Sequence, residues 1–142
     1  MQQVTVLYVE DHDLVLFTVK QLLELEGWRV RICRDGGEAL RHIKGDEHFD
    51  LIITDAELPT VSGFELIRKV RTLTHRQSTP VLCFTANDCG DEAIAAGAVA
   101  YLKKPGGIKD LIATCNRYLH SDTPDAADLS GQPGRARKVG NA

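Results

Sequence analysis

The chain has 142 residues, 43% of them hydrophobic and 26% charged, which suits a globular protein with a single core. Its net charge of −3 is too mild for direct nucleic-acid binding by the chain as a whole. No apolar run approaches the ~20 residues that span a membrane, and no signal peptide is visible, so we expect a cytoplasmic protein that does not enter the membrane.

Strand-like and helix-like segments alternate five times along the chain. The strand-like runs are residues 4–9, 28–33, 51–54, 80–85 and 99–102. Helical patterns cover residues 14–26, a segment that ends at Lys44, a segment that begins at Ser62, and residues 91–96 and 107–119. Continuous apolar strands between amphipathic helices predict an α/β fold, with helices on both faces of a parallel sheet.

Local signals mark the ends and the buried faces of these helices. Asp35 and Ser62 each precede a glutamate by three residues, Glu38 and Glu65, which predicts capping boxes. The predicted buried faces of the first, third and fifth helices are Val15, Val19, Leu22 and Leu23; Phe64, Ile67, Val70 and Leu73; and Ile108, Leu111, Ile112, Cys115 and Leu119. The first helix begins near His12 or Asp13, and the fourth is predicted to be short.

The composition changes at Ser121. Residues 121–142 are rich in Gly, Pro, Asp and Ala and contain few large apolar residues. We therefore expect one folded domain over residues 1–120 and a disordered tail or linker over residues 121–142.

The four cysteines lie mostly in apolar runs and lack the Cys-x-x-Cys spacing of metal sites. They are Cys33, Cys83, Cys89 and Cys115. We expect buried free thiols, and the scattered histidines disfavour a zinc site.

Charged and polar residues follow the predicted strands where these end. Glu10 and Asp11 follow the first strand, Asp55 follows the third, Thr85 ends the fourth, and Lys104 comes shortly after the fifth. The carboxyl ends of parallel strands line the ligand crevice of open α/β sheets, so these groups are expected to converge there.

This set of side chains suits phosphoryl transfer to a carboxylate. Asp55 is the expected nucleophile, and Asp11 and Asp55, with Glu10 through water, are the expected ligands of Mg²⁺. Lys104 and Thr85 are expected to contact the phosphoryl oxygens. Competing interpretations stay open: Glu10 and Asp11 as a loop and helix cap, Thr85 as ordinary strand filler, and Lys103 in place of Lys104.

Five motifs in order closely resemble the receiver domain of two-component response regulators, over about residues 4–119. They are Glu10-Asp11, residues 55–59 with Gly63, Thr85-Ala86, Tyr101, and Lys104-Pro105. The resemblance implies a flavodoxin-like (βα)5 sheet with strand order 2-1-3-4-5. It also implies a lysine held through a cis proline peptide at Lys104-Pro105.

The resemblance further implies a signalling mechanism. Asp55 accepts a phosphoryl group from a sensor histidine kinase or a histidine phosphotransfer protein, and the backbone carbonyl of Glu57 joins the magnesium ligands. Thr85 and Tyr101 form the switch that alters a surface for a downstream target or output domain, although Tyr101 also suits an ordinary half-buried aromatic. Glu57 and Asn87 stand where the family tunes hydrolysis of the acyl phosphate. Such a domain catalyses only its own phosphorylation and dephosphorylation.

Two departures and three alternatives qualify this interpretation. The stretch from Thr85 to Tyr101 is short, and Gly106-Gly107 softens the loop after Lys104. One alternative is a degenerate receiver that acts as a phosphorylation-independent interaction module. A haloacid-dehalogenase-like phosphohydrolase and a flavodoxin-type cofactor binder are the others. The phosphohydrolase would carry an aspartate where Glu57 stands. The flavodoxin-type protein would need a glycine- and hydroxyl-rich phosphate loop after the first strand.

Overall fold

The computed structural model describes residues 3–120, so the predicted tail at residues 121–142 lies outside the described part. A five-stranded sheet forms the centre of the molecule, with strand order β2-β1-β3-β4-β5 and every neighbouring pair parallel. The strands are β1 (Thr5–Val9), β2 (Arg29–Cys33), β3 (Leu51–Thr54), β4 (Val81–Thr85) and β5 (Ala100–Lys103). The predicted sheet and its strand order are confirmed.

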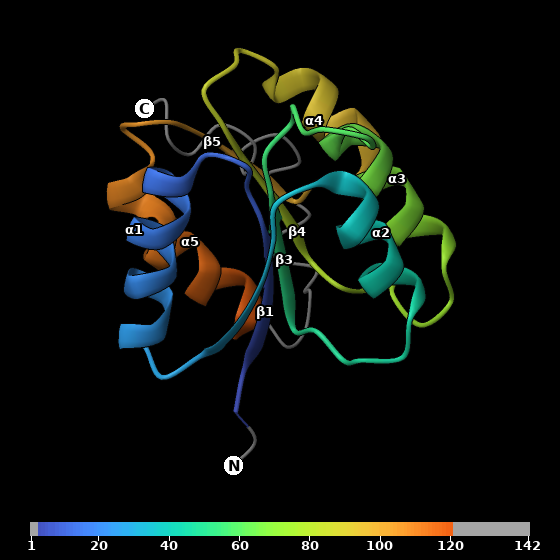
Figure 1. The fold of residues 1–142 in the computed structure, drawn as a ribbon, viewed down its shortest axis with the longest axis horizontal. Coiled ribbons are helices and arrows are strands. Elements are labelled where there is room, and N and C mark those ends of the chain that lie inside the picture. The colour runs from blue at the N-terminus through green and yellow to red at the C-terminus, as the bar shows by residue number, and fades with distance from the viewer. Residues whose placement is uncertain (1–2, 121–142) are drawn as a thin grey trace, which may run out of the picture.

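Five helices cover the two faces of this sheet. They are α1 (Asp13–Leu25), α2 (Gly36–Lys44), α3 (Gly63–Thr72), α4 (Gly90–Ala96) and α5 (Ile108–Leu119). Helices α1 and α5 lie on one side and α2, α3 and α4 on the other, each side enclosing its own hydrophobic cluster (Figure 1). Two covered faces explain why β3 and β4 are buried along their whole length and apolar up to the threonine that ends each strand.

The edge strand β2 has a different composition. Arg29 and Arg31 are exposed on it, while Cys33 at its end is buried. Charged side chains on an edge strand discourage pairing with another chain. The alternating pattern of this strand in the sequence therefore reflects its position at the edge.

The predicted helix caps are largely confirmed, with one correction. Ser62 and Glu65 make both hydrogen bonds of a capping box at the start of α3. At α2, the Asp35 side chain accepts from the Glu38 N–H at 2.8 Å, but the Glu38 carboxylate accepts from the Arg34 N–H instead of that of Asp35. Only half of the second capping box therefore forms.

The buried faces of α1 and α3 contain residues that the predicted stripes missed. Leu16 joins Val19 and Leu23 in the core, and Leu66 joins Ile67 and Val70, whereas the predicted Val15, Leu22, Phe64 and Leu73 are only partly buried. A helix packed against a twisted sheet buries a stripe wider than one heptad seam, so neighbouring apolar positions share the core.

Two arginines fasten helix ends to neighbouring segments through backbone carbonyls. Arg76 is 2% exposed and donates to the carbonyl oxygens of His42, Ile43 and Gly45 at the end of α2. Arg71 donates to those of Gly97, Thr79 and Gln77, which joins α3 to the end of α4. Helix α4 is short, as predicted, with seven residues. A helix of this length has little stability of its own, so it depends on such contacts.

Among the described residues, none of the helices combines the length and the apolar character needed to cross a bilayer.

Candidate phosphoacceptor site

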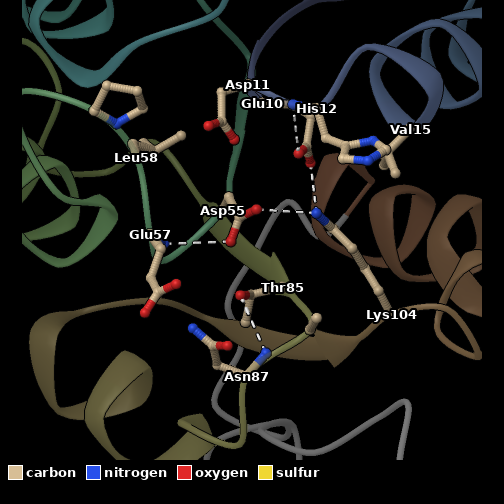
Figure 2. Close-up of a pocket in the computed structure, with 12 residues that line it drawn as sticks. Glu10, Asp11, His12, Val15, Asp55, Glu57, Leu58, Thr85, Asn87 and Lys104 are labelled. Carbon is tan, nitrogen blue, oxygen red and sulfur yellow. Dashed lines mark hydrogen bonds and ion pairs between the residues drawn. The ribbon is translucent and has the colours of Figure 1, made fainter.

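A cavity of about 480 Å³ opens at the carboxyl edge of the sheet. Glu10, Asp11, Asp55, Thr85 and Lys104 all line it, as Figure 2 shows. The predicted strand-end residues are therefore brought together, although they lie up to 94 positions apart in the sequence.

Asp55 follows β3 and sits at the centre of the cavity. Its backbone N–H donates to the Val9 carbonyl oxygen at 3.2 Å, which fixes it beside the end of β1. One carboxylate oxygen accepts from the Glu57 N–H at 3.3 Å, and the other accepts from the Lys104 ammonium at 3.0 Å. The side chain is 12% exposed, so it is oriented by the protein yet open to the cavity.

Gly63 allows the chain after Asp55 to turn back closely. A Cβ atom at this position would lie 1.9 Å from the Asp55 carbonyl oxygen. The Gly63 N–H instead donates to the Ala56 carbonyl oxygen at 2.9 Å. A larger residue would push the start of α3 away from the loop that carries Asp55.

Glu10 is buried and held by three groups. Its carboxylate accepts from the Lys104 ammonium at 2.6 Å, from the His12 N–H at 3.3 Å and from the Tyr8 hydroxyl at 3.5 Å. Burial raises the pKa of Glu10, the Lys104 ammonium opposes this shift, and the nearby Asp55 carboxylate adds to it, so that the net pKa is raised. A second negative charge near Asp55 is therefore costly in this pocket without further positive charge.

Lys104 directly follows β5, and the peptide bond from Lys104 to Pro105 is cis, as expected. Burial lowers the pKa of Lys104, but its hydrogen bonds to Glu10 and Asp55 and the charges of these carboxylates outweigh burial and raise it. Lys103 instead pairs at 2.6 Å with the exposed Asp88, outside the cavity. Lys104 is therefore the lysine of the site.

Thr85 and Tyr101 connect the cavity to the segment before α4. The Thr85 hydroxyl accepts from the Asn87 N–H at 3.4 Å, and the Tyr101 hydroxyl donates to the Asn87 carbonyl oxygen. Tyr101 is 1% exposed, so its ring lies in the core. The half-buried environment considered for this aromatic is wrong.

Three carboxylates form a group that suits a divalent cation. One oxygen each of Glu10, Asp11 and Asp55 lies within 4.8 Å of the other two. Mg²⁺ takes oxygen ligands and keeps several waters, and it would relieve the repulsion among these carboxylates. Asp11 lines the cavity and is exposed, so water can complete such a coordination shell.

Sequence reasoning missed Tyr8 as a contact of the site. Tyr8 stands two residues before Glu10, and alternation along a strand places both side chains on the same side. Burial, aided by the Glu10 and Asp55 carboxylates, raises the pKa of Tyr8 and keeps its hydroxyl protonated as a donor to Glu10.

The family model that matches this chain describes the response regulator receiver domain and covers residues 6–116. Among curated proteins, the response regulator MprA of Mycolicibacterium vanbaalenii is 34% identical over 86% of this chain and 53% of its own length. The probable transcriptional regulatory protein TcrX of Mycobacterium tuberculosis is 30% identical over 92% of this chain and 56% of its own length. The chain thus spans about half the length of the curated relatives it matches.

Solved structures show the same architecture. The receiver domain of the sensor histidine kinase PA1611 from Pseudomonas aeruginosa has a TM-score of 0.76 and 26% identity, over 83% of this chain and 98% of that one. That structure holds a magnesium ion in its active-site cleft. The chemotaxis response regulator CheY4 of Vibrio cholerae has a TM-score of 0.75 and 32% identity, over 82% of this chain and 99% of that one.

Proposed function

This chain belongs to the response regulator receiver family, and from that premise we propose that Asp55 accepts the phosphoryl group in a two-component pathway or phosphorelay. A receiver domain is a regulatory phosphoacceptor and not a true enzyme, so the phosphohydrolase alternative is dropped. The family match also argues against the alternative of a flavodoxin-type cofactor binder. The observation that carries the proposal is the Asp55 carboxylate, held by Lys104 within a group of three carboxylates.

The transfer is a displacement at phosphorus. An Asp55 carboxylate oxygen forms a bond to the phosphorus of a phosphohistidine while the bond from phosphorus to the donor nitrogen breaks. The donor imidazole keeps that electron pair, and the product is an acyl phosphate on Asp55. Lys104 supplies positive charge beside the transferred group, and Thr85 contributes a hydroxyl at the end of β4.

Magnesium fits the donor set of this pocket. Asp11, Asp55 and the backbone carbonyl of Glu57 would hold it, with Glu10 acting through water. When bound, Mg²⁺ shields the carboxylates from the negative charge of the incoming group. Glu10 already pairs with Lys104 at 2.6 Å, which supports a role in orienting that lysine as well.

Family membership implies a histidine kinase as partner. We propose that the donor to Asp55 is a sensor histidine kinase or a histidine phosphotransfer protein. The downstream target or output domain is a separate question, because the matched curated relatives are about twice as long as the shared region.

The switch would act through Thr85 and Tyr101, and hydrolysis of the acyl phosphate would be tuned by Glu57 and Asn87. Thr85 and Tyr101 both contact Asn87, so a shift of the Thr85 hydroxyl toward a phosphoryl group would disturb the segment before α4.

Intact-mass and NMR measurements test the proposal. Wild-type protein with Mg²⁺ and a small acyl phosphate should gain one phosphoryl group, and a beryllofluoride mimic should shift resonances around the cavity. Asp55→Asn should show neither response, whereas Asp50→Asn, at the opposite end of β3, should respond like wild type. If folded wild-type protein stays unmodified, the proposal fails and the phosphorylation-independent interaction module is the remaining interpretation. If Asp55→Asn is modified as much as wild type, the acceptor is a residue other than Asp55.

A further inference from the structure

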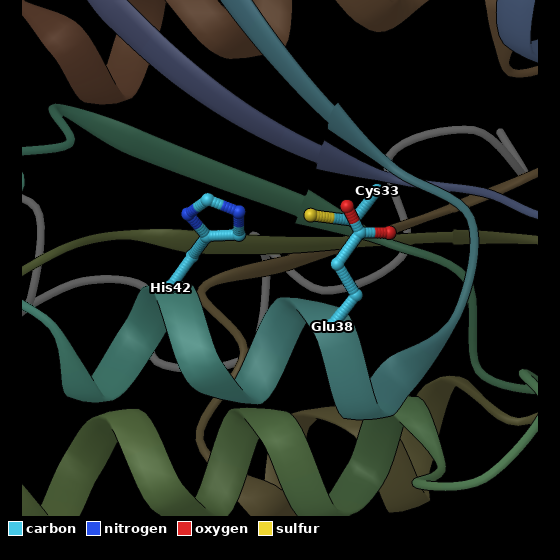
Figure 3. A group of neighbouring side chains, drawn as sticks. All are labelled: Cys33, Glu38 and His42. Atoms are coloured by element: carbon cyan, nitrogen blue, oxygen red, sulfur yellow. The ribbon is translucent and has the colours of Figure 1, made fainter.

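A second group of ligand-type side chains lies between β2 and α2, outside the cavity that Asp55 lines. Cys33 ends β2, and Glu38 and His42 project from α2 four residues apart, on one face of that helix (Figure 3). One ligand atom of each lies within 4.8 Å of the other two. The turn from β2 into α2 thus joins a buried thiol to a carboxylate and an imidazole.

The chemistry of this trio differs from that of the acidic pocket. Thiolate, imidazole and carboxylate are the three ligand types of zinc sites, whereas Mg²⁺ selects oxygen ligands alone. A tetrahedral zinc ion holds its ligand atoms about 3.5 Å apart, given bonds of about 2.0–2.3 Å. The trio would close by roughly 1 Å, which rotation of the partly buried Glu38 and His42 side chains can supply.

Polar groups lie beside two of these side chains. Nδ1 of His42 lies 4.0 Å from a Glu47 carboxylate oxygen, and Figure 3 shows the other edge of the ring turned toward the Cys33 sulfur. A zinc-ligating histidine usually donates its other ring N–H to a carboxylate. Glu47 is the nearby carboxylate, but at 4.0 Å it is beyond hydrogen-bonding distance, and the same oxygen pairs with Arg31 at 2.9 Å. The Glu38 carboxylate is held by the Arg34 N–H at 3.4 Å.

We propose that Cys33, Glu38 and His42 bind a zinc ion, with water completing a tetrahedral shell. This site would clip the edge strand β2 to α2. It would also adjoin the acidic pocket through the backbone, because the Cys33 carbonyl oxygen accepts from the Glu10 N–H at 3.0 Å. The proposal does not depend on phosphorylation of Asp55.

The environment of Cys33 favours the protonated form of its thiol. Burial raises the pKa of the Cys33 thiol to about 12, the Glu38 carboxylate adds to this, and Arg31 and Arg41 oppose it. The thiol is therefore protonated at neutral pH, and zinc binding would release a proton.

The test is a titration with Co²⁺ as a spectroscopic stand-in for zinc, in excess Mg²⁺ so that the acidic pocket is occupied. We expect a thiolate-to-cobalt absorption band that saturates at one equivalent and is displaced by Zn²⁺. The band should be unchanged in Asp55→Asn, because that variant alters only the acidic pocket. The band should disappear in Cys33→Ser. In His42→Gln the apparent affinity for Co²⁺ should fall at least tenfold.

Matched controls separate this site from other thiols and histidines. Cys115→Ala removes a buried thiol on the opposite face of the sheet, and His48→Gln removes an exposed imidazole, so both should keep the band. If Cys33→Ser does not fold, His42→Gln, on an accessible part of α2, decides the question. No band in wild type, or a band that survives in both ligand variants, would overturn the proposal.

Discussion

The acidic pocket and the region around α4 are adjacent in the fold but are held together by different contacts. In the pocket, charged side chains from separate strand ends bond directly to one another, with Lys104 between Glu10 and Asp55. Around α4, the contacts run from side chains to backbone carbonyls: Arg71 to Gly97 and Tyr101 to Asn87. The contacts in the pocket balance charge, and the contacts around α4 hold the backbone in position.

This difference implies that the two regions can be altered separately. Substitutions in the pocket should change the phosphoryl chemistry proposed for Asp55. Substitutions at Arg71 or Tyr101 should change the position and stability of α4 while the chemistry stays intact. Thr85 and Asn87 both line the cavity and connect it to the segment before α4, through the 3.4 Å hydrogen bond between them.

Lys104→Met should have the largest effect, because it removes a side-chain cation that bonds to both Glu10 and Asp55. We expect phosphorylation by a small acyl phosphate to slow by about a hundredfold, the usual loss when one preorganised donor is removed. Initial rates from intact mass would measure it. The matched control is Lys103→Met, whose ion pair with Asp88 is exposed, and its rate should stay within about twofold of wild type.

A Lys104→Met rate near that of wild type would show that this ammonium does not assist transfer. The variant's fold needs a separate check by circular dichroism, since loss of the lysine leaves Glu10 buried with only neutral donors.

Much of the fold could be predicted because each strand and helix carries its own signal. Apolar runs gave β3 and β4, and Ser62 with Glu65 marked the start of α3. The pocket followed from one geometric rule, that parallel strands end at a common edge. Asp55, Glu10 and Lys104 could thus be placed together without knowledge of their distances.

The remainder depended on contacts between distant segments, which leave no local pattern. Nothing near Arg76 in the sequence shows that it reaches the end of α2, 31 to 34 positions earlier. The scattered histidines disfavoured zinc, yet the turn before α2 brings His42 to Cys33. The inward position of Tyr101 likewise depends on Asn87, on the other side of α4 in the chain.

Arg71→Met should have the next largest effect and should be confined to the α4 region. It removes the donor to the carbonyl oxygens of Gly97 and Thr79, in part-buried hydrogen bonds, and of Gln77, in an exposed one. Leaving the part-buried acceptors without a donor costs about 1–3 kcal/mol. We expect hydrogen exchange in α4 to accelerate and the free energy of unfolding to fall by about that amount. Phosphorylation of Asp55 should proceed at the wild-type rate.

The exposed Arg68, three residues earlier on α3, provides the control for charge. Arg68→Met should leave exchange in α4 unchanged. Slower phosphorylation in Arg71→Met would contradict the proposed separation of the two regions.

Tyr101→Phe should have a smaller effect, because it removes one hydrogen bond while the ring stays packed in the core. We expect a loss of about 1 kcal/mol in urea unfolding and altered NMR shifts at Asn87. Tyr118→Phe is the matched control: its hydroxyl donates to the Val99 carbonyl oxygen at 3.2 Å, away from the pocket. If beryllofluoride shifts α4 resonances equally in Tyr101→Phe and wild type, the hydroxyl has no part in the switch.

Glu10→Gln should have the smallest effect, visible only as a change in the pH dependence of stability without Mg²⁺. Because the pKa of Glu10 is raised in the folded protein, the native state binds its proton more tightly than the unfolded chain does. The contribution of Glu10 to stability is therefore full below its ordinary pKa of 4.5 and is lost as pH rises through the raised value. Lys104, Asp55 and Tyr8 face this carboxyl group and set the size of the effect.

Urea unfolding from pH 4.5 toward neutrality would measure this contribution. The free energy of unfolding should decline with rising pH less steeply in Glu10→Gln than in wild type. Glu24 forms an exposed ion pair with Lys20 on α1, and Glu24→Gln should match the wild-type slope. Added Mg²⁺ should counteract the decline in wild type more than in Glu10→Gln, because the cation offsets the charge that the variant lacks. Equal slopes in wild type and Glu10→Gln would mean that Lys104 fully neutralises Glu10, and the crowding of carboxylates would then give no reason for a cation at this site.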